Sequence, residues 1–461
     1  MGAAFLLSFT LTLDPAQAIS ITTAIYCSAT FAAAITAILI NTPGTAASAT
    51  TCLDGYPLAQ RGEAGRALGM AVFSSAIGGV FSIIYLMIAA PSLARAAYNF
   101  SLPEYFALTL CGLSMLASIG DGSTIKNLIA RGLEIFLALV GVDNLTTVER
   151  FTFGSYQLYE GIRFVPVMIG VFGISELLIR AANLQVVREQ VIMKAITRPS
   201  RADYKKSWHT IVRSSGIGTF IGILPAEGAT VAAMIGYNEA ERWSKNPEEF
   251  GHGAIEGIAR SEAANNAAMG GAMVPTLALD IPSSATAAVI LAGLMVHGVR
   301  PGPTMFTEQA EFVYAIFWSM LLVNILFFLV GLRGAKVFAG VTLIPVQILW
   351  PTVFVFSIVG TYALDQSIFD VWVALTAGVV GFFMHHYGFS DAPLAIGLIL
   401  GGMLEQRLGQ PMVRLDEKWW LMFTRPLTLF FFILTALALF GQALFGIFKR
   451  RLLNSTGGTA E

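Results

Sequence analysis

The sequence predicts an all-α, polytopic membrane protein, and three observations support this fold class. Of its 461 residues, 55% are hydrophobic and only 12% are charged, whereas soluble domains carry about 25% charged residues. The mean hydropathy is +0.69, and several uncharged runs are long enough to enter a bilayer. These runs lack the apolar–polar alternation of membrane β-barrel strands, so helices are expected.

The first long run contains its own interruption. Between Asp14 and Asp54 lie 39 residues without a formal charge. As one helix they would measure about 58 Å, roughly twice the thickness of the hydrocarbon core. The run must therefore turn back or cross twice, and the break falls in the segment "NTPGT", residues 41–45.

Further apolar runs continue to the end of the chain, and some are too short to span a membrane alone. They raise the expected total to about eleven or twelve hydrophobic elements, and they occupy residues 67–90, 105–119, 129–142, 164–179, 214–236, 267–296, 312–332, 341–359, 371–384, 393–403 and 426–447.

Two basic segments indicate orientation. The connector 185–209 contains six Lys and Arg residues, and the polar tail 448–461 begins "FKRR". Both are expected in the cytoplasm. The connector separates a first half, 1–184, from a second half, 210–447. A net charge of −1 gives no basic bias towards nucleic acid, and three cysteines without a CxxC pair suggest no disulfide framework.

The two halves interrupt their apolar runs in a similar way. When Pro43 is aligned with Pro282, Asn41 faces Asp280 and Thr45 faces Ser284. Each break has a polar residue two positions before the proline and small hydroxyl residues after it. We therefore expect two pseudo-symmetric, inverted repeats with proline-broken, re-entrant segments, the layout of many secondary transporters.

The breaks are the predicted substrate site. A half-helix that starts at such a break presents N–H groups and a positive dipole end, which suit a carboxylate. The alternative is a plain proline kink capped by serine and threonine. The residues predicted to bind substrate are Asn41, Pro43, Gly44, Thr45, Ser48, Asn265, Asn266, Pro282, Ser283, Ser284 and Thr286.

Three residues are predicted to take part in ion coupling: Asp280, Asn41 and Glu227. Asp280 carries the only formal charge between Glu262 and Arg300, where a charge is costly. For Asp280 the alternative is a structural role, in which backbone N–H groups or an arginine satisfy the carboxylate. For Glu227 the alternative is a position at the cytoplasmic end or the edge of a cavity, where it caps a helix. Residues 238–262 are expected to form an amphiphilic loop, with Asn265 and Asn266 at the entry of the following helix.

Enzyme signatures are absent from the sequence. His385 and His386 are adjacent and point about 100° apart on a helix, so they do not form a metal pair. No HExxH, P-loop or GxSxG motif occurs in a plausible context. No metal site or catalytic residue is predicted, and a membrane-embedded enzyme is the less favoured alternative.

Long motifs resemble one transporter family. "AILINTPGTAASATTCLDGYPLAQRG" (37–62), "RFTFGSYQLYEGIRFVPVMIGVFGISELL" (150–178) and "IARSEAANNAAMGGAMVPTLALDIPSSATAA" (258–288) are similar to the TctA family, the large membrane subunits of tripartite tricarboxylate transporters. The resemblance implies a cation-coupled symporter of organic carboxylates in the bacterial inner membrane. It also implies two partners, a small TctB-like membrane subunit and a periplasmic TctC-like solute-binding protein, with Na⁺ or H⁺ as coupling ion and no other cofactor.

The chain departs from the family pattern at several positions. The family usually has Pro-Gly where this chain has Pro225-Ala226. It usually has Ile-Pro-Gly-Ser where this chain has Ile-Pro-Ser-Ser at residues 281–284, so Ser283 replaces a glycine. A Gly-Gly-Ser of the first half corresponds to residues 32–34, which are alanines. With these changes, the expected substrates include organic anions other than citrate. The chain also begins just after an expected Pro-Gly turn, so an inactive or truncated scaffold is the alternative.

Overall fold

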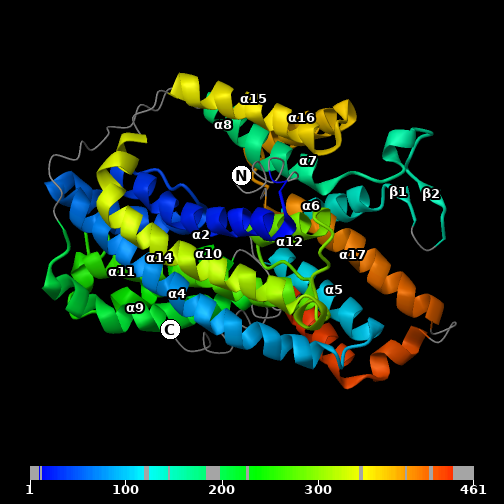
Figure 1. Cartoon of the computed structure of the whole chain (residues 1–461), viewed down its shortest axis with the longest axis horizontal. Helices are drawn as coiled ribbons and strands as arrows, with labels where there is room; N and C mark the ends of the chain where they lie inside the picture. Colours follow the sequence, from blue (N-terminus) through cyan, green and yellow to red (C-terminus); the bar gives the residue numbers. More distant parts are fainter. Residues whose placement is uncertain are drawn as a thin grey trace, which may run out of the picture. The chain divides into compact units, whose positions relative to one another are not determined.

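The computed structural model describes residues 10, 13–118, 124–143, 146–182, 198–224, 228–341, 346–389, 392–414 and 419–439. The chain forms two compact units, which are described separately. Unit 1 contains Met1–Tyr98 and Arg163–His386, and unit 2 contains Asn99–Ile162 and Tyr387–Glu461. Helices dominate both units (Figure 1), which confirms the all-α fold class.

Unit 1 consists of helices throughout its described part. Short 3₁₀ or π segments, labelled η, join several α-helices. The elements are α2 (Pro15–Ile40), η1 (Ala46–Ser48), α3 (Ala49–Leu58), η2 (Ala59–Glu63), α4 (Ala64–Ala97), α7 (Phe164–Met168), η4 (Ile169–Ile174), α8 (Ser175–Ala182), α9 (Arg201–Ile223), α10 (Gly228–Trp243), η5 (Pro247–Glu249), α11 (Ile255–Leu279), α12 (Ala285–Val296), α13 (Met305–Glu308), α14 (Ala310–Val341), α15 (Val346–Asp365) and α16 (Ile368–His386).

Helix α11 is the buried centre of this unit. All of its 25 residues are buried, and it packs against α4, α9 and α10 (Figure 1). Glycines permit the close approach: a β-carbon added at Gly78 of α4 would lie 2.2 Å from the Ala263 carbonyl oxygen of α11. Gly218 of α9 meets the Ala264 carbonyl in the same way, at 2.3 Å. Small residues that bring backbones together are typical of helix packing in membranes.

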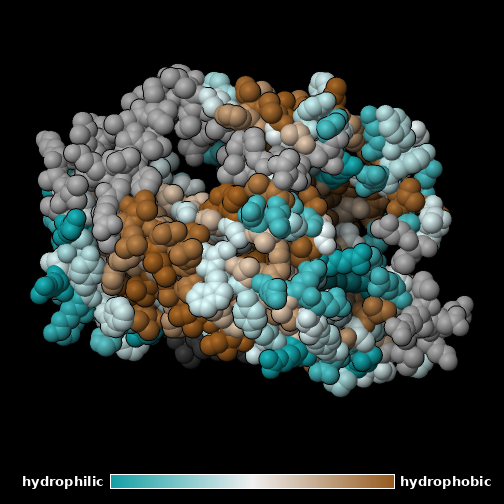
Figure 2. All heavy atoms as spheres, viewed as in Figure 1, coloured by the Kyte–Doolittle hydropathy of each residue, from teal (hydrophilic) through white to brown (hydrophobic). Residues whose placement is uncertain are grey.

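Other helices of unit 1 present apolar side chains outwards. Hydrophobic atoms gather along α14 and the adjacent part of α4 (Figure 2). On α14, Trp318 is 62% exposed and Leu322 is 56% exposed; on α4, Ile88 is 67% exposed. Four helical segments of the described chain are long and apolar enough to cross a membrane, namely Pro15–Ile40, Ala46–Ala97, Ala310–Gly331 and Ile368–His386. An apolar exterior over a packed interior is expected where lipid replaces water.

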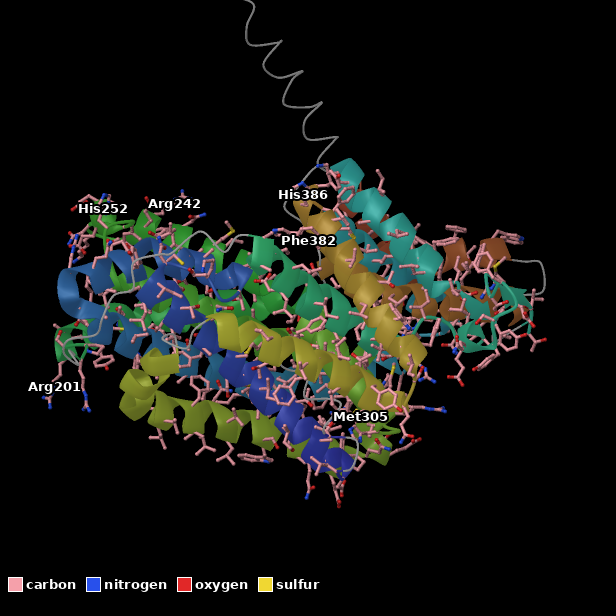
Figure 3. All side chains as sticks on the ribbon, turned by 90° about the horizontal axis from the view of Figure 1, so that it is seen from above. Arg201, Arg242, His252, Met305, Phe382 and His386 are labelled. Atoms are coloured by element: carbon pink, nitrogen blue, oxygen red, sulfur yellow. The ribbon has the colours of Figure 1, made fainter. Side chains whose placement is uncertain are left out.

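Polar residues collect at one end of this helical group. Figure 3 places Arg201, Arg242 and His252 at one end and Met305 towards the other. At the polar end the Arg66 guanidinium forms an ion pair with Asp203 at 2.6 Å, and Lys206 pairs with Glu256 at 2.9 Å. Asp203 also completes a capping box with Ser200 at the start of α9. These contacts fix the beginning of α9 against α4 and α11.

Unit 2 has its own polar anchors. Glu104 is 2% exposed; its carboxylate accepts hydrogen bonds from the Ser101 backbone N–H at 2.9 Å and from Arg425 Nε at 2.6 Å. Arg150 forms an ion pair with Glu405. The described elements of this unit are α5 (Leu102–Ser118), α6 (Thr124–Ala138), the antiparallel pair β1 (Gly141–Val142) and β2 (Glu149–Arg150), η3 (Tyr156–Leu158), α17 (Ala392–Arg414), η6 (Trp419–Thr424) and a helix over Pro426–Leu439.

The glycine contact between α9 and α11 yields a stability prediction. Gly218→Ala forces a methyl group against the Ala264 backbone, so it is expected to destabilise unit 1 by about 1–3 kcal/mol. Gly216→Ala on the same helix is the matched control, because nothing lies within 4 Å of its added β-carbon. It should be neutral or stabilising by up to about 1 kcal/mol. Thermal unfolding of the purified protein in detergent measures both effects, and equal midpoints would contradict the packing argument.

Candidate functional site

The chain breaks between α2 and α3 where the sequence predicts. Asn41 ends α2 in the left-handed conformation, with φ 49° and ψ 38°, and its N–H donates to the Thr36 carbonyl. Thr45 is extended, with φ −139° and ψ 161°, and its hydroxyl oxygen accepts from the Ser48 N–H. Ser48 Oγ accepts from the Thr45 N–H in return, which completes a capping box. A new helical segment therefore starts at Ala46.

The second break repeats this backbone geometry. Asp280 ends α11 in the left-handed conformation, with φ 60° and ψ 38°, and its N–H donates to the Pro275 carbonyl. Ser284 is extended, with φ −153° and ψ 163°, and its side chain accepts from the Ala287 N–H at the start of α12. The aligned pairs Asn41–Asp280 and Thr45–Ser284 thus have matching conformations. The division into two repeats stays a prediction.

Both restarted helices open onto one cavity of about 330 Å³, within the size range of small-molecule sites. A third helix, α10, also begins there at Gly228. The first N–H groups of a helix have no carbonyl partner within it, and the dipole makes this end positive. None of the described residues that line the cavity carries a formal charge. They are Tyr26, Thr30, Thr45, Ala46, Ala47, Phe172, Gly222, Gly228, Ala229, Thr230, Asn265, Ala268, Met269, Ala272, Ser283, Ser284, Ala285 and Thr286.

Asn265 is the most unusual polar group in this lining. It lies inside α11 and is 1% exposed. Neither its amide nitrogen nor its amide oxygen has a hydrogen-bond partner within the described part of the chain. Leaving such a group unpaired costs about 1–3 kcal/mol, so buried amides are normally paired. An amide that faces a cavity with both atoms unpaired suits a bound ligand that supplies a donor and an acceptor.

The structure brings only part of the predicted site together. Thr45, Asn265, Ser283, Ser284 and Thr286 line the cavity. The remaining residues have other positions. Asn41, Pro43, Gly44, Pro282 and Asp280 belong to the two turns, Ser48 is occupied in the capping box, and Asn266 bonds to Glu262. Glu227 and Pro225 lie outside the described residues. Their roles in binding and coupling stay predictions.

One expectation about the second half was wrong. The segment 238–262 is not a continuous loop, because α10 extends to Trp243 and α11 begins at Ile255. Asn265 and Asn266 consequently lie in the middle of α11 rather than at its entry. At the α11 end of this stretch, Glu256, Arg260 and Glu262 are buried by packing against neighbouring helices, which a hydropathy pattern does not register.

Sequence reasoning also missed several lining residues and one buried acid. Tyr26, Thr30 and Phe172 line the cavity from α2 and η4, and nothing in their local sequence distinguishes them from other apolar-run residues. Glu262 is fully buried in α11. Its signal was available, because it is the last charge before a long uncharged run, but the expected loop placed it at the surface.

The fold and this cavity define a class of protein. Apolar helices enclose a cavity at the starts of three helices, and its described lining residues carry no formal charge, an arrangement that resembles the ion and substrate sites of discontinuous transporter helices. The chain belongs to the tripartite tricarboxylate transporter TctA family, whose model matches residues 1–396. It is therefore a membrane protein of a transporter family and not of an enzyme family.

Two relatives from Agrobacterium vitis are similar to this chain. An uncharacterized 52.8 kDa protein in the TAR-I ttuC′ 3′ region is 37% identical over 413 residues, covering 89% of this chain and 82% of the relative. An uncharacterized protein in the TAR-II ttuC′ 3′ region is 35% identical over 196 residues, covering 42% of this chain and 81% of the relative. No solved structure matches the chain.

The unpaired amide of Asn265 yields a prediction that separates stability from binding. Asn265→Leu replaces an unsatisfied buried amide by a side chain of similar size, so the unfolding midpoint without ligand should be unchanged or higher. Stabilisation by added tricarboxylate should decrease, because the lost hydrogen bonds correspond to about 1.5–3 kcal/mol, or about 10–150-fold in Kd. Thermal shift with citrate, and with sulfate as control anion, measures both. Undiminished stabilisation by citrate would contradict this role.

Proposed function

We propose that this protein is the large membrane subunit of a cation-coupled transporter that takes up tricarboxylates or related organic anions across the bacterial inner membrane. A small TctB-like membrane subunit and a periplasmic TctC-like solute-binding protein would complete the system. The single observation that carries the proposal is the convergence of three helix starts on one cavity whose described lining residues carry no formal charge. Family membership supports the tricarboxylate class.

The proposed binding mode uses backbone dipoles instead of charged side chains. Carboxylates would meet N–H groups at the starts of η1, α10 and α12. The hydroxyls of Thr45 and Ser284 cap their own helices through their oxygen atoms. A hydroxyl can also donate, so each could contribute a further bond to a carboxylate. Neutral donors bind an anion less tightly than a buried arginine does. The weaker binding favours release of the substrate on the opposite side of the membrane.

The Asn265 amide narrows the substrate class. Its nitrogen can donate to a carboxylate, and its oxygen needs a donor. A hydroxycarboxylate supplies both, whereas a carboxylate without a hydroxyl group leaves the amide oxygen unpaired. A site built to bond a hydroxyl discriminates strongly against an analogue that lacks it.

This substrate class is tested with two ligands that differ by one hydroxyl group. Citrate is expected to bind the wild-type protein at least about tenfold more tightly than tricarballylate, by the energy of one satisfied polar group. In Asn265→Leu the two affinities should converge. Calorimetric titration in detergent gives both constants, and an equal preference in the wild-type protein would rule out the hydroxyl contact.

Placing a negative charge at Ser284, the residue that caps α12, tests whether an anion binds at this position. Aspartate and asparagine both cap helices as well as serine does, so Ser284→Asp and Ser284→Asn should fold alike. The aspartate places a negative charge against the bound carboxylate and should lower uptake at least tenfold more than the asparagine does. Uptake of labelled carboxylates into proteoliposomes containing all three proteins provides the measurement. Equal uptake by the two variants would argue against anion binding at Ser284.

A further inference from the structure

A second polar cluster lies inside unit 1, around Glu262. The Glu262 side chain is 0% exposed in the middle of α11. Its carboxylate accepts hydrogen bonds from Thr51 Oγ1 of α3 at 2.5 Å and from Ser75 Oγ of α4 at 3.0 Å. Asn266 Nδ2 donates to the same carboxylate at 3.4 Å and to Ser75 Oγ at 2.8 Å. Three helices therefore meet at one buried acid.

The described partners of this acid are all neutral. Among the described residues, no hydrogen bond or ion pair joins Glu262 to a basic side chain. Several charged groups on the helices packed against it are engaged elsewhere. Arg66 pairs with Glu63 and Asp203, Lys206 pairs with Glu249 and Glu256, Arg213 and Arg260 pair with Glu239, and Asp54 accepts from the N–H groups of Gly253 and Ala254. Further titratable groups on these helices include His209 and Tyr204 of α9 and Tyr237 of α10.

An ionised carboxylate without a countercharge is costly in such a place. The penalty amounts to several kcal/mol, and protonation removes it. The partners tolerate both states, because the hydroxyls of Thr51 and Ser75 can donate to a carboxylate or accept from a carboxylic acid. An arginine partner would instead hold the acid ionised. Asn266 also retains an amide oxygen with no partner in the described chain, a spare acceptor beside the acid.

The cluster connects directly to the substrate cavity. Asn265, next to Asn266, lines that cavity from the same helix. Thr51 belongs to α3, which continues from η1, and the start of η1 lines the cavity as well. Movement of this half-helix on substrate binding would change the Thr51–Glu262 hydrogen bond. Occupancy of the cavity and the charge on Glu262 can thus influence each other.

We propose that Glu262 is the proton-binding carboxyl group that couples transport to a pH gradient. The proposal rests on the proposed transport function and specifies its coupling ion. The carboxylate takes up one proton from water on the outer side and returns it to water on the inner side, with no other bond made or broken. Thr51, Ser75 and Asn266 act as positioning residues that satisfy the acid in both protonation states.

The test compares Glu262→Gln with Glu256→Gln in proteoliposomes that contain the complete transporter. Glu256 lies on the same helix and pairs with Lys206, so it is the matched control. With an acidic exterior and equal Na⁺, the wild-type protein and Glu256→Gln should accumulate labelled citrate. Glu262→Gln should accumulate at least about tenfold less. Because citrate itself titrates between pH 5 and 8, exchange is compared with that of Glu256→Gln at each pH. The ratio should change with pH for Glu262→Gln and stay constant for the wild-type protein.

Thr51→Val provides an independent variant if Glu262→Gln does not fold. Removing one donor favours the protonated acid, so the midpoint of the pH dependence of uptake should move to higher pH.

Three outcomes would overturn the coupling assignment while leaving carboxylate transport intact. They are wild-type-like accumulation by Glu262→Gln, an unshifted midpoint in Thr51→Val, and accumulation driven only by a Na⁺ gradient. No uptake by the wild-type protein under either gradient would contradict the proposed function itself.

Discussion

Backbone contact between α11 and its neighbours is the constraint on which the rest of unit 1 depends. Gly78 and Gly218 allow α4 and α9 to approach the carbonyl groups of α11 directly. Such proximity buries every residue of α11, and space beside this helix remains at the cavity that Asn265 lines. Polar side chains on this helix must then find partners among themselves, in neighbouring helices or in a ligand. The cavity and the acid cluster are two results of that requirement.

The interruption of the helices makes the cavity suitable for an anion. At both breaks a left-handed residue ends one helix, and an extended hydroxyl residue caps the next. A continuous helix would carry its N–H groups in internal bonds, whereas a restarted helix presents the first of them to the cavity. The helix starts thereby make the site positive, and no basic side chain occurs among its described lining residues. A field of this kind attracts an anion without forming the strong, directional pair that would slow its release.

The two asparagines of α11 show how neighbouring residues acquire different roles. Asn265 faces the cavity, and neither of its amide atoms has a partner among the described residues, while Asn266 bonds to Glu262 and Ser75. Successive residues of a helix point about 100° apart, so one pair of identical side chains can serve two environments. Substrate site and acid cluster are consequently separated by a single residue along the chain.

The sequence by itself determined the membrane class, the helical content, both proline breaks and the family. These features depend on local composition, on the length of uncharged runs and on motifs that a single chain displays. The sequence did not determine that α10 and α11 extend through residues assigned to a loop, or which hydroxyls face the cavity. Nor did it reveal that Glu262, Thr51 and Ser75 meet. Those facts depend on which faces of α3, α4 and α11 oppose one another. Tertiary packing decides this, and it joins Glu262 to residues about 190 to 210 positions away, too far for a local sequence pattern to predict.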